Sequence, residues 1–385
     1  MPPGRAQALT LDDIDTPALV LDAARMERNV ARLTRRLEAL GVAFRPHVKT
    51  AKSVDVARSL FAGGRGPITV STLREAEYFA GHGFTDMIYA VGLAPTKIAR
   101  VQALNEGGLD LKVLIDTPEQ AQALVAAGRA GRRSPAVLIE IDCDGHRGGV
   151  RPDDPQLADI AAILRAGGVE LRGVLTHAGE SYNCRGGAGL PEAAEAERAA
   201  VVAAAQRLRA LGHAAPVVSV GSTPTAHFAR DLTGVTEVRA GVFVFFDLVM
   251  HGIGVCAIDD IALSVLATVI GHRPEKGWLL IDAGWMALSR DRGTARHPVD
   301  QGYGVVCDVE GRPLEDLIVV DASQEHGIIG VRPGSAARLP DLAIGSRVRI
   351  LPNHACATGA QHDAYQVVRT GHRELVANWP RMRGW

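Results

Sequence analysis

The sequence predicts a parallel (β/α)8 barrel followed by a β-rich second domain. Short runs rich in Val, Ile and Leu alternate with Ala-, Arg- and Glu-rich stretches of helical period. Eight such β-α repeats occupy roughly 235 residues, which is the usual size of this barrel. After Met250, strand-like runs separated by turn residues replace the alternation. We therefore expect a barrel over residues 17–250 and a β-rich domain over residues 251–385, together with residues 1–16.

Each element is predicted from its own run of residues. The predicted barrel strands are Val42–Val48, Ile68–Thr72, Met87–Val91, Leu111–Ile115, Val137–Asp142, Leu171–His177, Pro216–Gly221 and Val238–Phe245. The clearest helices are Glu119–Ala130 and Pro191–Leu211, and Ala51–Phe61 forms a shorter helical stretch. The predicted strands of the second domain are Ala262–Val269, Gly277–Ile281, Leu317–Val320, Ser346–Leu351 and Ala364–Val368.

The composition argues against several classes of protein. Hydrophobic residues make up 47% of the chain, and the formal net charge is −1 with both signs interspersed. Neither a nucleic-acid-binding face nor a membrane-binding basic run is present. The longest apolar runs are strand-sized, and the N-terminus lacks the apolar core of a signal peptide. The five cysteines are odd in number and scattered, which indicates a reducing compartment. We expect a cytoplasmic protein.

Lys49 is the strongest candidate for chemistry. It ends a predicted strand, just before a helical stretch, in a chain with five lysines and thirty-seven arginines. A lysine amine can form a Schiff base with an aldehyde cofactor, whereas an arginine cannot. The C-terminal ends of barrel strands open on the active-site face. Lys49 is therefore our candidate for the residue that carries pyridoxal phosphate, the alternative being an ordinary surface lysine.

Other polar residues fall at the same ends of the predicted strands. Arg147 follows the fifth strand, His177 ends the sixth, and Gly221-Ser222-Thr223 follows the seventh. The loops after strands seven and eight of such barrels often bind phosphate, and small residues allow close approach to its oxygens. Taken one at a time, a Gly-Ser-Thr turn is also an ordinary helix cap and a strand-end histidine an ordinary structural group.

Alternation along the first strand places Arg45, His47 and Lys49 on one face. Three cationic groups inside a barrel are costly unless they are paired or lose their charge. Glu140 and Asp142 on the fifth strand are the expected partners. Membership in a buried ion-pair network is our preferred interpretation of Arg45 and His47.

A second cluster, His354-Ala355-Cys356, lies in the β-rich domain. In an extended chain this spacing projects both side chains the same way. Imidazole nitrogen with thiolate sulfur favours zinc over magnesium or calcium. Two ligands cannot close a structural site, so a bound metal would keep positions open for water or substrate.

Several stretches together resemble the fold-type III pyridoxal-phosphate enzymes, whose barrel is similar to that of alanine racemase. The branch is that of the D-serine dehydratases and D-threonine aldolases, and the resemblance covers nearly the whole chain. Its most specific stretches are residues 45–50, 70–76, 176–179, 282–285 and 352–356. Residues 219–226, 245–250 and 286–294 are most similar to dehydratases that act on D-threo-3-hydroxyaspartate.

This resemblance implies roles for individual residues. Lys49 would hold pyridoxal 5'-phosphate covalently, and Arg147 would contact the phenolic oxygen of the cofactor. His177 and Tyr182 would lie against the ring or its nitrogen. The predicted phosphate site is Gly221, Ser222 and Thr223. His354 and Cys356 would hold a divalent metal (Zn, Mn, Co or Mg) beside the substrate's β-hydroxyl, and we count both as catalytic with Lys49.

The resemblance also implies an activity. We expect a homodimeric, metal-dependent lyase that converts a D-3-hydroxy amino acid, D-threo-3-hydroxyaspartate or D-serine, to a 2-oxo acid and ammonia. The alternative is an aldolase that releases glycine and an aldehyde from D-threonine, although that branch typically has a carboxylate where Cys356 stands. After the lysine motif the group commonly has His-Lys, whereas this chain has Ala51-Lys52. This difference weakens any role proposed for a histidine at that position. A racemase is disfavoured, because its reaction would not use the His354–Cys356 metal cluster. A non-catalytic pyridoxal-phosphate carrier is also disfavoured, because such proteins are usually single barrels without a second domain like residues 251–385.

Overall fold

The computed structural model describes residues 9–185 and 187–385 and divides into two compact units. One is formed by Ala31–Gly241 with the last two residues, the other by the chain up to Val30 with Val242–Arg383. The predicted bounds of the two domains stay a prediction. None of the helices in the described part of the chain is both long and apolar enough to cross a membrane.

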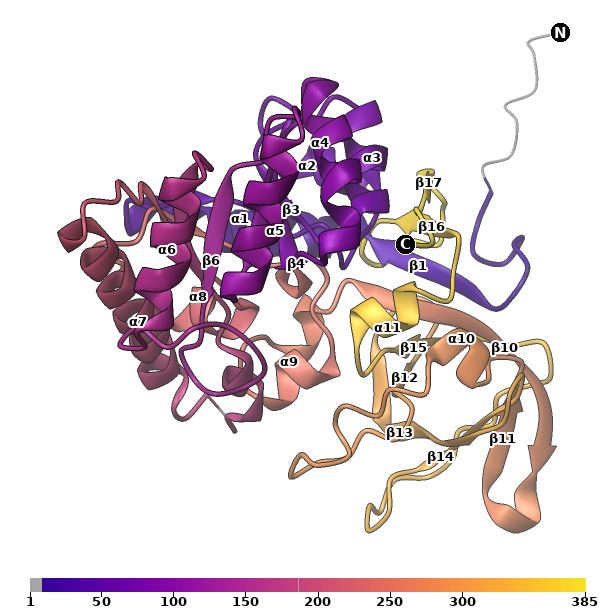
Figure 1. The fold of residues 1–385 in the computed structure, drawn as a ribbon. Coiled ribbons are helices and arrows are strands. Elements are labelled where there is room, and N and C mark those ends of the chain that lie inside the picture. Colours follow the sequence, from indigo (N-terminus) through magenta and orange to yellow (C-terminus); the bar gives the residue numbers. More distant parts are fainter. Residues whose placement is uncertain (1–8, 186) are drawn as a thin grey trace, which may run out of the picture. The chain divides into compact units, whose positions relative to one another are not determined.

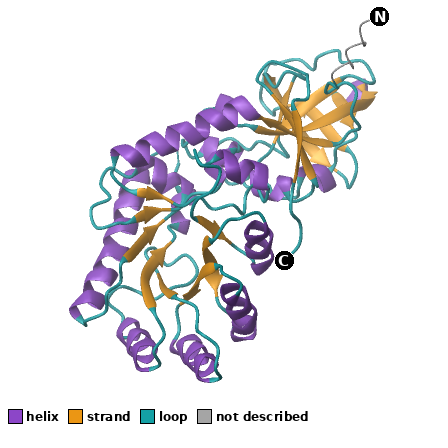
Figure 2. Ribbon diagram, turned by 90° about the horizontal axis from the view of Figure 1, so that it is seen from above, coloured by secondary structure: helices purple, strands orange, loops and turns teal. Residues whose placement is uncertain are grey.

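The first unit contains an eight-stranded parallel sheet in the order β2-β9-β8-β7-β6-β5-β4-β3. Its strands are β2 (Ala43–Phe44), β3 (Ile68–Val70), β4 (Asp86–Gly92), β5 (Asp110–Ile115), β6 (Val137–Ile141), β7 (Leu171–Thr176), β8 (Val217–Val220) and β9 (Glu237–Val238). A parallel bridge between His47 and Thr69 joins the two ends of this order. The sheet therefore curves into the barrel predicted from the sequence, surrounded by helices (Figure 2).

The predicted strands Val42–Val48 and Val238–Phe245 are too long. β2 and β9 each contain two residues, and residues 242–244 form a 3-10 helix. Pro46 has no N–H to donate, which interrupts regular pairing. The backbone still pairs beyond β2, because the N–H groups of Arg45 and His47 donate to the carbonyls of Val238 and Ala240.

Helices follow the barrel strands. They are α2 (Val54–Ser59), α3 (Leu73–Gly81), α4 (Ile98–Glu106), α5 (Pro118–Arg129), α6 (Gln156–Ala166), α7 (Leu190–Ala210) and α8 (Thr223–Phe228), and α1 (Ala23–Ala39) precedes β2. α5 begins at a capping box, in which Thr117 and Gln120 satisfy each other's backbone N–H. The predicted helices Glu119–Ala130 and Pro191–Leu211 are confirmed to within one residue at each end.

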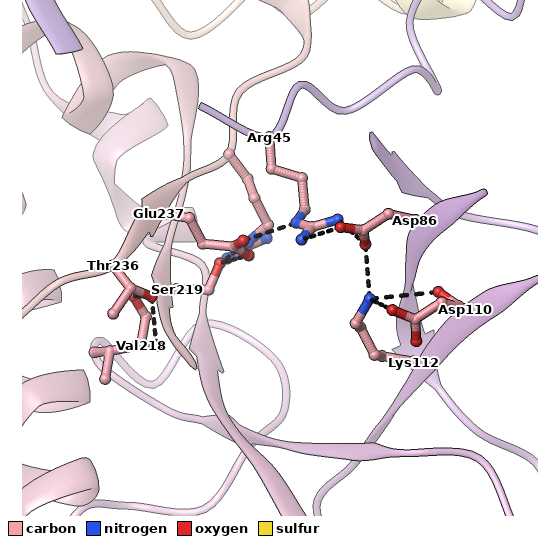
Figure 3. A network of polar contacts seen from close by, with 9 residues as sticks. Arg45, Asp86, Asp110, Lys112, Val218, Ser219, Thr236 and Glu237 are labelled. Carbon is pink, nitrogen blue, oxygen red and sulfur yellow. Dashed lines mark hydrogen bonds and ion pairs between the residues drawn. The ribbon is translucent and has the colours of Figure 1, made fainter. Parts of the chain in front are cut away.

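An ion-pair network with buried cations, Arg45 and Lys112, lies inside the barrel (Figure 3). Arg45 donates to Glu237 at 2.8 Å and to Asp86 at 2.7 Å, and Lys112 donates to Asp86 at 2.7 Å. The interpretation of Arg45 as a member of such a network is confirmed. Its expected partners were wrong, because Glu140 lies nearest Arg147 and Asp142 accepts backbone N–H groups of its own loop. Asp86 and Glu237 come from strands that the alternation argument did not consider.

The second unit contains a nine-stranded sheet in the order β11-β14-β13-β12-β15-β10-β1-β16-β17 (Figure 1). Its strands are β1 (Ala18–Asp22), β10 (Leu263–Arg273), β11 (Trp278–Ile281), β12 (Val305–Cys307), β13 (Pro313–Ala322), β14 (Gly327–Val331), β15 (Arg347–Leu351), β16 (Ala364–Val368) and β17 (Ala377–Pro380). All pairs are antiparallel except β1 with β16. The expected β-rich domain is confirmed, and its five predicted strands all form.

Two features of this unit bear on the site. The segment ahead of β1 joins it through a bridge between Thr10 and Glu374. Short α-helices also lie in its C-terminal part, namely α9 (Leu248–Gly252), α10 (Trp285–Leu288) and α11 (Ala355–Gly359). α9 and α11 are linked through Asp247, which caps α9 and also accepts the Ala355 N–H at 2.9 Å.

Candidate active site

Lys49 lies in a turn directly after the point where the barrel closes. The preceding Val48 N–H donates to the Thr69 carbonyl at 3.0 Å, and the Lys49 N–H points to His47 Nδ1 at 3.4 Å. The Lys49 side chain is exposed. This position is at the C-terminal rim of the barrel, where the sequence analysis expected it, although regular strand pairing ends before it. An exposed primary amine at this rim can react with an aldehyde.

His47 sits beneath this turn. Its Nε2 lies 3.2 Å from Ser71 Oγ. Burial lowers the pKa of His47 well below its ordinary value, and the positive charges of Lys49 and Arg239 lower it further. A neutral imidazole therefore lies beside the Lys49 turn. It belongs to this polar cluster and not to the ion pairs of Arg45, so that part of the interpretation was wrong.

His177 follows β7 and its ring orientation is fixed. Nδ1 lies 2.5 Å from the Gly221 carbonyl oxygen. A carbonyl only accepts, so Nδ1 carries the proton and donates, and Nε2 keeps its lone pair. Burial lowers the pKa of His177 to about 3, with Lys49, Arg147 and Arg239 contributing in the same direction. The Tyr182 ring lies 6.2 Å from the His177 ring, centroid to centroid, at an interplanar angle of 50°.

The loop after β8 contains the three predicted phosphate ligands, and they differ in availability. The Gly221 N–H already donates to Glu197 Oε1 at 3.0 Å, and a Cβ at this position would collide with the Arg239 carbonyl. Ser222 Oγ caps α8 by accepting the Thr225 N–H at 3.2 Å. Thr223 is buried, and its Oγ1 has no hydrogen-bond partner among the described residues. Of these three residues, Thr223 therefore has the side chain best able to donate a hydrogen bond to a bound anion.

Arg147 lies in the loop after β6. Asp142 shapes this loop by accepting the N–H groups of Asp144 and Gly145 at 3.1 and 2.6 Å. The Arg147 side chain is exposed, and its Nη2 lies 3.7 Å from Glu140 Oε1. Burial raises the pKa of Glu140, an effect that Arg147 opposes. The loop thus presents a cation at the same rim as Lys49 and His177.

The second unit contains the candidate metal ligands. His354 is the N-cap of α11 in extended conformation, and Cys356 lies inside the first turn of that helix. The predicted extended chain through both residues is therefore wrong, because the helix begins at Ala355. The two side chains nevertheless interact. A hydrogen bond with the Cys356 side chain is one of the causes that raise the pKa of His354.

Asp291 orients the imidazole of His354. Its Oδ2 lies 2.6 Å from His354 Nδ1, so Nδ1–H donates and Nε2 is left for another partner. Proteins use this carboxylate–histidine pairing to orient metal-binding imidazoles. Burial lowers the pKa of His354, but Cys356, Asp291 and Asp247 outweigh it and raise the value to about 11, so a metal bound at Nε2 would displace a proton from the imidazolium. The pairing and the sulfur fit zinc or a related divalent metal with two protein ligands. The described residues contain no group of three or more His, Cys, Asp or Glu placed to hold a metal.

The sequence analysis did not identify three residues that shape these sites. Asp291 lies in a loop, Glu197 in the middle of α7, and Arg239 just after β9. Arg239 is buried, donates to Ser219 Oγ at 2.9 Å and to the Thr176 carbonyl, and lies among Glu197, Glu237 and Glu140. Burial lowers its pKa to about 10 despite those carboxylates. The one available signal was the resemblance of residues 286–294, which contain Asp291.

Comparison with known proteins matches both units. The sequence model of the alanine racemase N-terminal domain matches residues 21–249, and that of a putative serine dehydratase domain matches residues 262–368. D-threo-3-hydroxyaspartate dehydratase of Delftia sp. strain HT23 is 54% identical over 382 residues, which cover 98% of this chain and 99% of that protein. Its solved structure has a TM-score of 0.94 and covers 98% of this chain. Another structure of that dehydratase is of a cysteine-to-alanine variant in the metal-free form.

Relatives with other activities are less similar. D-serine dehydratase of Dictyostelium discoideum is 30% identical over 97% of this chain and 98% of that protein. The structure of D-threonine aldolase from Filomicrobium marinum is 26% identical, with a TM-score of 0.81 over 97% of each chain. The chain therefore belongs to the fold-type III pyridoxal-phosphate family, in the group that joins an alanine-racemase-like barrel to a serine-dehydratase domain.

Proposed function

We propose that this protein is a pyridoxal-phosphate- and divalent-metal-dependent ammonia-lyase for D-3-hydroxy amino acids. D-threo-3-hydroxyaspartate is the preferred substrate and would give oxaloacetate, and D-serine would give pyruvate. The 54% identity to a dehydratase of that substrate over the whole chain carries the proposal. The aldolases are more distant relatives, as expected from the cysteine at position 356.

The residues present fit the cofactor. Thr223 Oγ1 is a buried hydroxyl with no hydrogen-bond partner in the described part of the chain. The Gly221 backbone leaves no room for a side chain, and Lys49 is an exposed amine at the same rim. We assign the cofactor aldehyde to Lys49, the phosphate to the 221–223 loop, the ring to His177 and Tyr182, and the phenolic oxygen to Arg147. When bound, pyridoxal phosphate supplies an electron sink for the pair left on the substrate's Cα.

We assign the roles in this reaction to individual side chains of this protein. Lys49 Nζ, as the neutral amine, takes the Cα proton as general base. His177 is neutral and adds no charge beside the ring. His354 Nε2 and Cys356 Sγ would hold the metal, which supplies Lewis acidity toward the β-hydroxyl. Loss of the Cα proton and the hydroxyl gives water and an enamine. The enamine tautomerises to an imine, and water hydrolyses it to the 2-oxo acid and ammonia.

A product assay tests this proposal. The cofactor-loaded protein is incubated with D-threo-3-hydroxyaspartate, D-serine and D-threonine, and ammonia, 2-oxo acid, glycine and aldehyde are each quantified. We expect ammonia and 2-oxo acid in equal amounts, with the highest rate on D-threo-3-hydroxyaspartate. Glycine and an aldehyde as the main products would establish the aldolase instead.

We also propose that the protein is a homodimer, on the likeness of its fold to that of alanine racemase alone. Sedimentation equilibrium tests this, and a fully active monomer at every concentration would contradict it. The cytoplasmic location stays a prediction.

A further inference from the structure

Glu197 has a buried carboxyl group that takes no part in the proposed mechanism. It lies in the middle of α7 and is 2% exposed. Its Oε1 accepts two backbone N–H groups, from Ala178 and from Gly221, each at 3.0 Å. Ala178 directly follows His177, and Gly221 opens the 221–223 loop. One oxygen atom therefore joins the two loops to which we assign the cofactor's ring and phosphate.

The other oxygen of Glu197 begins a chain of hydroxyl groups. Glu197 Oε2 lies 2.6 Å from Thr225 Oγ1, which lies 2.9 Å from Ser222 Oγ. Ser222 Oγ lies 3.0 Å from Ser181 Oγ, and Ser181 Oγ lies 2.7 Å from the Ala178 carbonyl. The chain thus starts and ends on the Glu197–Ala178 pair. It forms a closed ring through both loops, and each of its side chains is buried.

We propose that Glu197 is a positioning residue for the cofactor and acts as a neutral carboxylic acid. This inference rests on the proposed function, because it assumes that the two loops hold pyridoxal phosphate. By fixing both loops to one side chain, Glu197 holds the ring-facing His177 and the phosphate-facing Thr223 in one geometry before the cofactor arrives.

A count of protons supports the neutral form. The four contacts of the hydroxyl chain need four protons, and the three hydroxyl groups supply three. A proton on Glu197 Oε2 provides the fourth, leaving Oε1 as a carbonyl-like oxygen that accepts two N–H groups. These four contacts are then satisfied in one direction, from Glu197 to the Ala178 carbonyl, and the Thr225 hydroxyl shares its proton with the Ser222 carbonyl at 3.3 Å. A carboxylate would leave one buried contact without a proton, which is costly.

The surrounding charges are compatible with a neutral Glu197. Burial raises its pKa, although the contact with Thr225, the N–H groups of Gly221 and Ala178 and the charge of Arg239 oppose this. Arg239 also faces Glu237 and Glu140, so its charge has partners without Glu197. A neutral acid also avoids placing a negative charge behind a loop assigned to a phosphate.

The test compares Glu197→Ala with Glu197→Gln. A glutamine in the same rotamer keeps the double acceptor and donates to Thr225, as the neutral acid does. Glu195→Gln is the matched control, since Glu195 lies on the same helix and pairs with Arg198 at the surface. The readouts are the dissociation constant of pyridoxal phosphate, the 31P chemical shift of the bound phosphate, and the infrared difference spectrum between wild type and Glu197→Gln.

We expect Glu197→Ala to weaken cofactor binding roughly tenfold or more and to move the 31P resonance. Glu197→Gln should stay within about threefold of wild type, and the difference spectrum should show a protonated carboxyl band. If Glu197→Ala does not fold, Thr225→Val breaks the same chain, and we expect the same loss from it. Wild-type affinity and 31P shift in Glu197→Ala or Thr225→Val would overturn the positioning role. An equal loss in Glu197→Gln and Glu197→Ala would overturn the neutral acid. Failure of the wild-type protein to bind pyridoxal phosphate would instead refute the proposed function.

Discussion

The Nδ1–H group of His177 donates to the carbonyl of Gly221 across 2.5 Å, which links the end of β7 to the end of β8. The contact fixes the tautomer of the imidazole and places its Nε2 lone pair on the other side of the ring. Because this histidine is partly buried and lies near the positive charges of Lys49, Arg147 and Arg239, it stays neutral in the folded protein. Its charge state has a consequence for stability.

We predict that stability falls as the pH falls below about 6.5, in part through His177. Its folded pKa of about 3 is below the ordinary value of 6.5, so between these values the unfolded chain binds a proton that the folded protein does not. Each pH unit in that window therefore removes about 1.4 kcal/mol of stability per such histidine. His47, whose pKa is also lowered, acts in the same direction.

Urea unfolding of wild type and His177→Gln at pH 7, 6 and 5 measures this effect. Glutamine can still donate to the Gly221 carbonyl but does not titrate. The variant should lose less stability per pH unit than the wild type, by the contribution of one proton. Parallel pH dependences would show that His177 is not the titrating group.

Lys49 and Lys52 form a matched pair for testing the covalent assignment. Lys49 is exposed at the barrel rim, whereas Lys52 is paired with the buried Glu75 at 3.0 Å. Borohydride reduction of the cofactor-loaded protein should label Lys49. Lys49→Ala should abolish the label, the visible absorbance and turnover, while Lys52→Arg, which keeps a cation beside the buried Glu75, should keep all three. A label on Lys52 would make the central assignment wrong.

The phosphate assignment predicts an order of effects. Thr223→Val removes a hydroxyl that has no partner among residues 9–185 and 187–385, so we expect little effect on the apoprotein. It should weaken cofactor binding by about 1.5–3 kcal/mol, the value for a bond to a charged phosphate. Ser222→Ala also removes the cap of α8, so it should additionally destabilise the apoprotein by about 1 kcal/mol. Dialysis measures cofactor retention and urea unfolding measures stability. Equal retention in Thr223→Val and wild type would remove Thr223 from the site.

Arg147 belongs to the other side of the assigned site. Arg147→Ala should weaken cofactor retention on dialysis and leave the fold intact, because the arginine is exposed and its nearest described carboxylate is 3.7 Å away. Arg151→Ala is a suitable control, since Arg151 lies farther along the same loop and pairs with Asp153 at the surface. A loss of the same size in both variants would indicate a general charge effect.

The short runs rich in Val, Ile and Leu predicted the barrel well, because each barrel strand is a separate apolar segment of the sequence. The positions of Lys49, His177 and the 221–223 loop followed from strand ends. Arg239 could not be found in this way, since its importance comes from Thr176 and Ser219, which lie on other strands. It also stood inside a run predicted to be a strand to Phe245.

Glu197 shows the same limit in a helix. It lies among alanines and other glutamates in α7, a pattern typical of an exposed helical face. Its burial depends on the neighbouring loops after β7 and β8, which only the folded barrel brings to it. Similarly, the alternation along residues 44–49 put Arg45 in the barrel but could not select Asp86 and Glu237 as its partners.

Those partners make the barrel interior sensitive to one substitution. Arg45→Met would remove the guanidinium that donates to the buried Glu237, and breaking such a buried pair typically costs about 3–5 kcal/mol. Asp110→Asn is the control, because Asp110 also contacts this network through Lys112 but its side chain is 57% exposed. We expect less than about 1 kcal/mol from the control. Urea unfolding compares the two, and equal losses would contradict the importance of burial here.

The candidate metal ligands lead to the last prediction. Chelation should abolish ammonia release but keep the visible absorbance of the bound cofactor, because the assigned cofactor residues and the His354–Cys356 pair belong to different units of the chain. His354→Ala should act like chelation. Asp291→Asn should keep both ligands but weaken metal affinity about 10–100-fold, since it removes the carboxylate that orients the imidazole. Asp300→Asn is its control, because Asp300 pairs with Arg292 and not with the imidazole.

Cα–H exchange separates the metal's role from that of Lys49. In heavy water, metal-free protein with D-serine should still exchange the Cα proton, because Lys49 is the base, but it should release no pyruvate. Cys356→Asp should keep a ligand but shift the metal preference toward magnesium or manganese, because oxygen is a harder donor than sulfur. It should also raise any aldolase side reaction, since the aldolases typically have a carboxylate there. Full ammonia release by Cys356→Ala in the presence of a chelator would show that this pair is structural and that another acid acts on the hydroxyl.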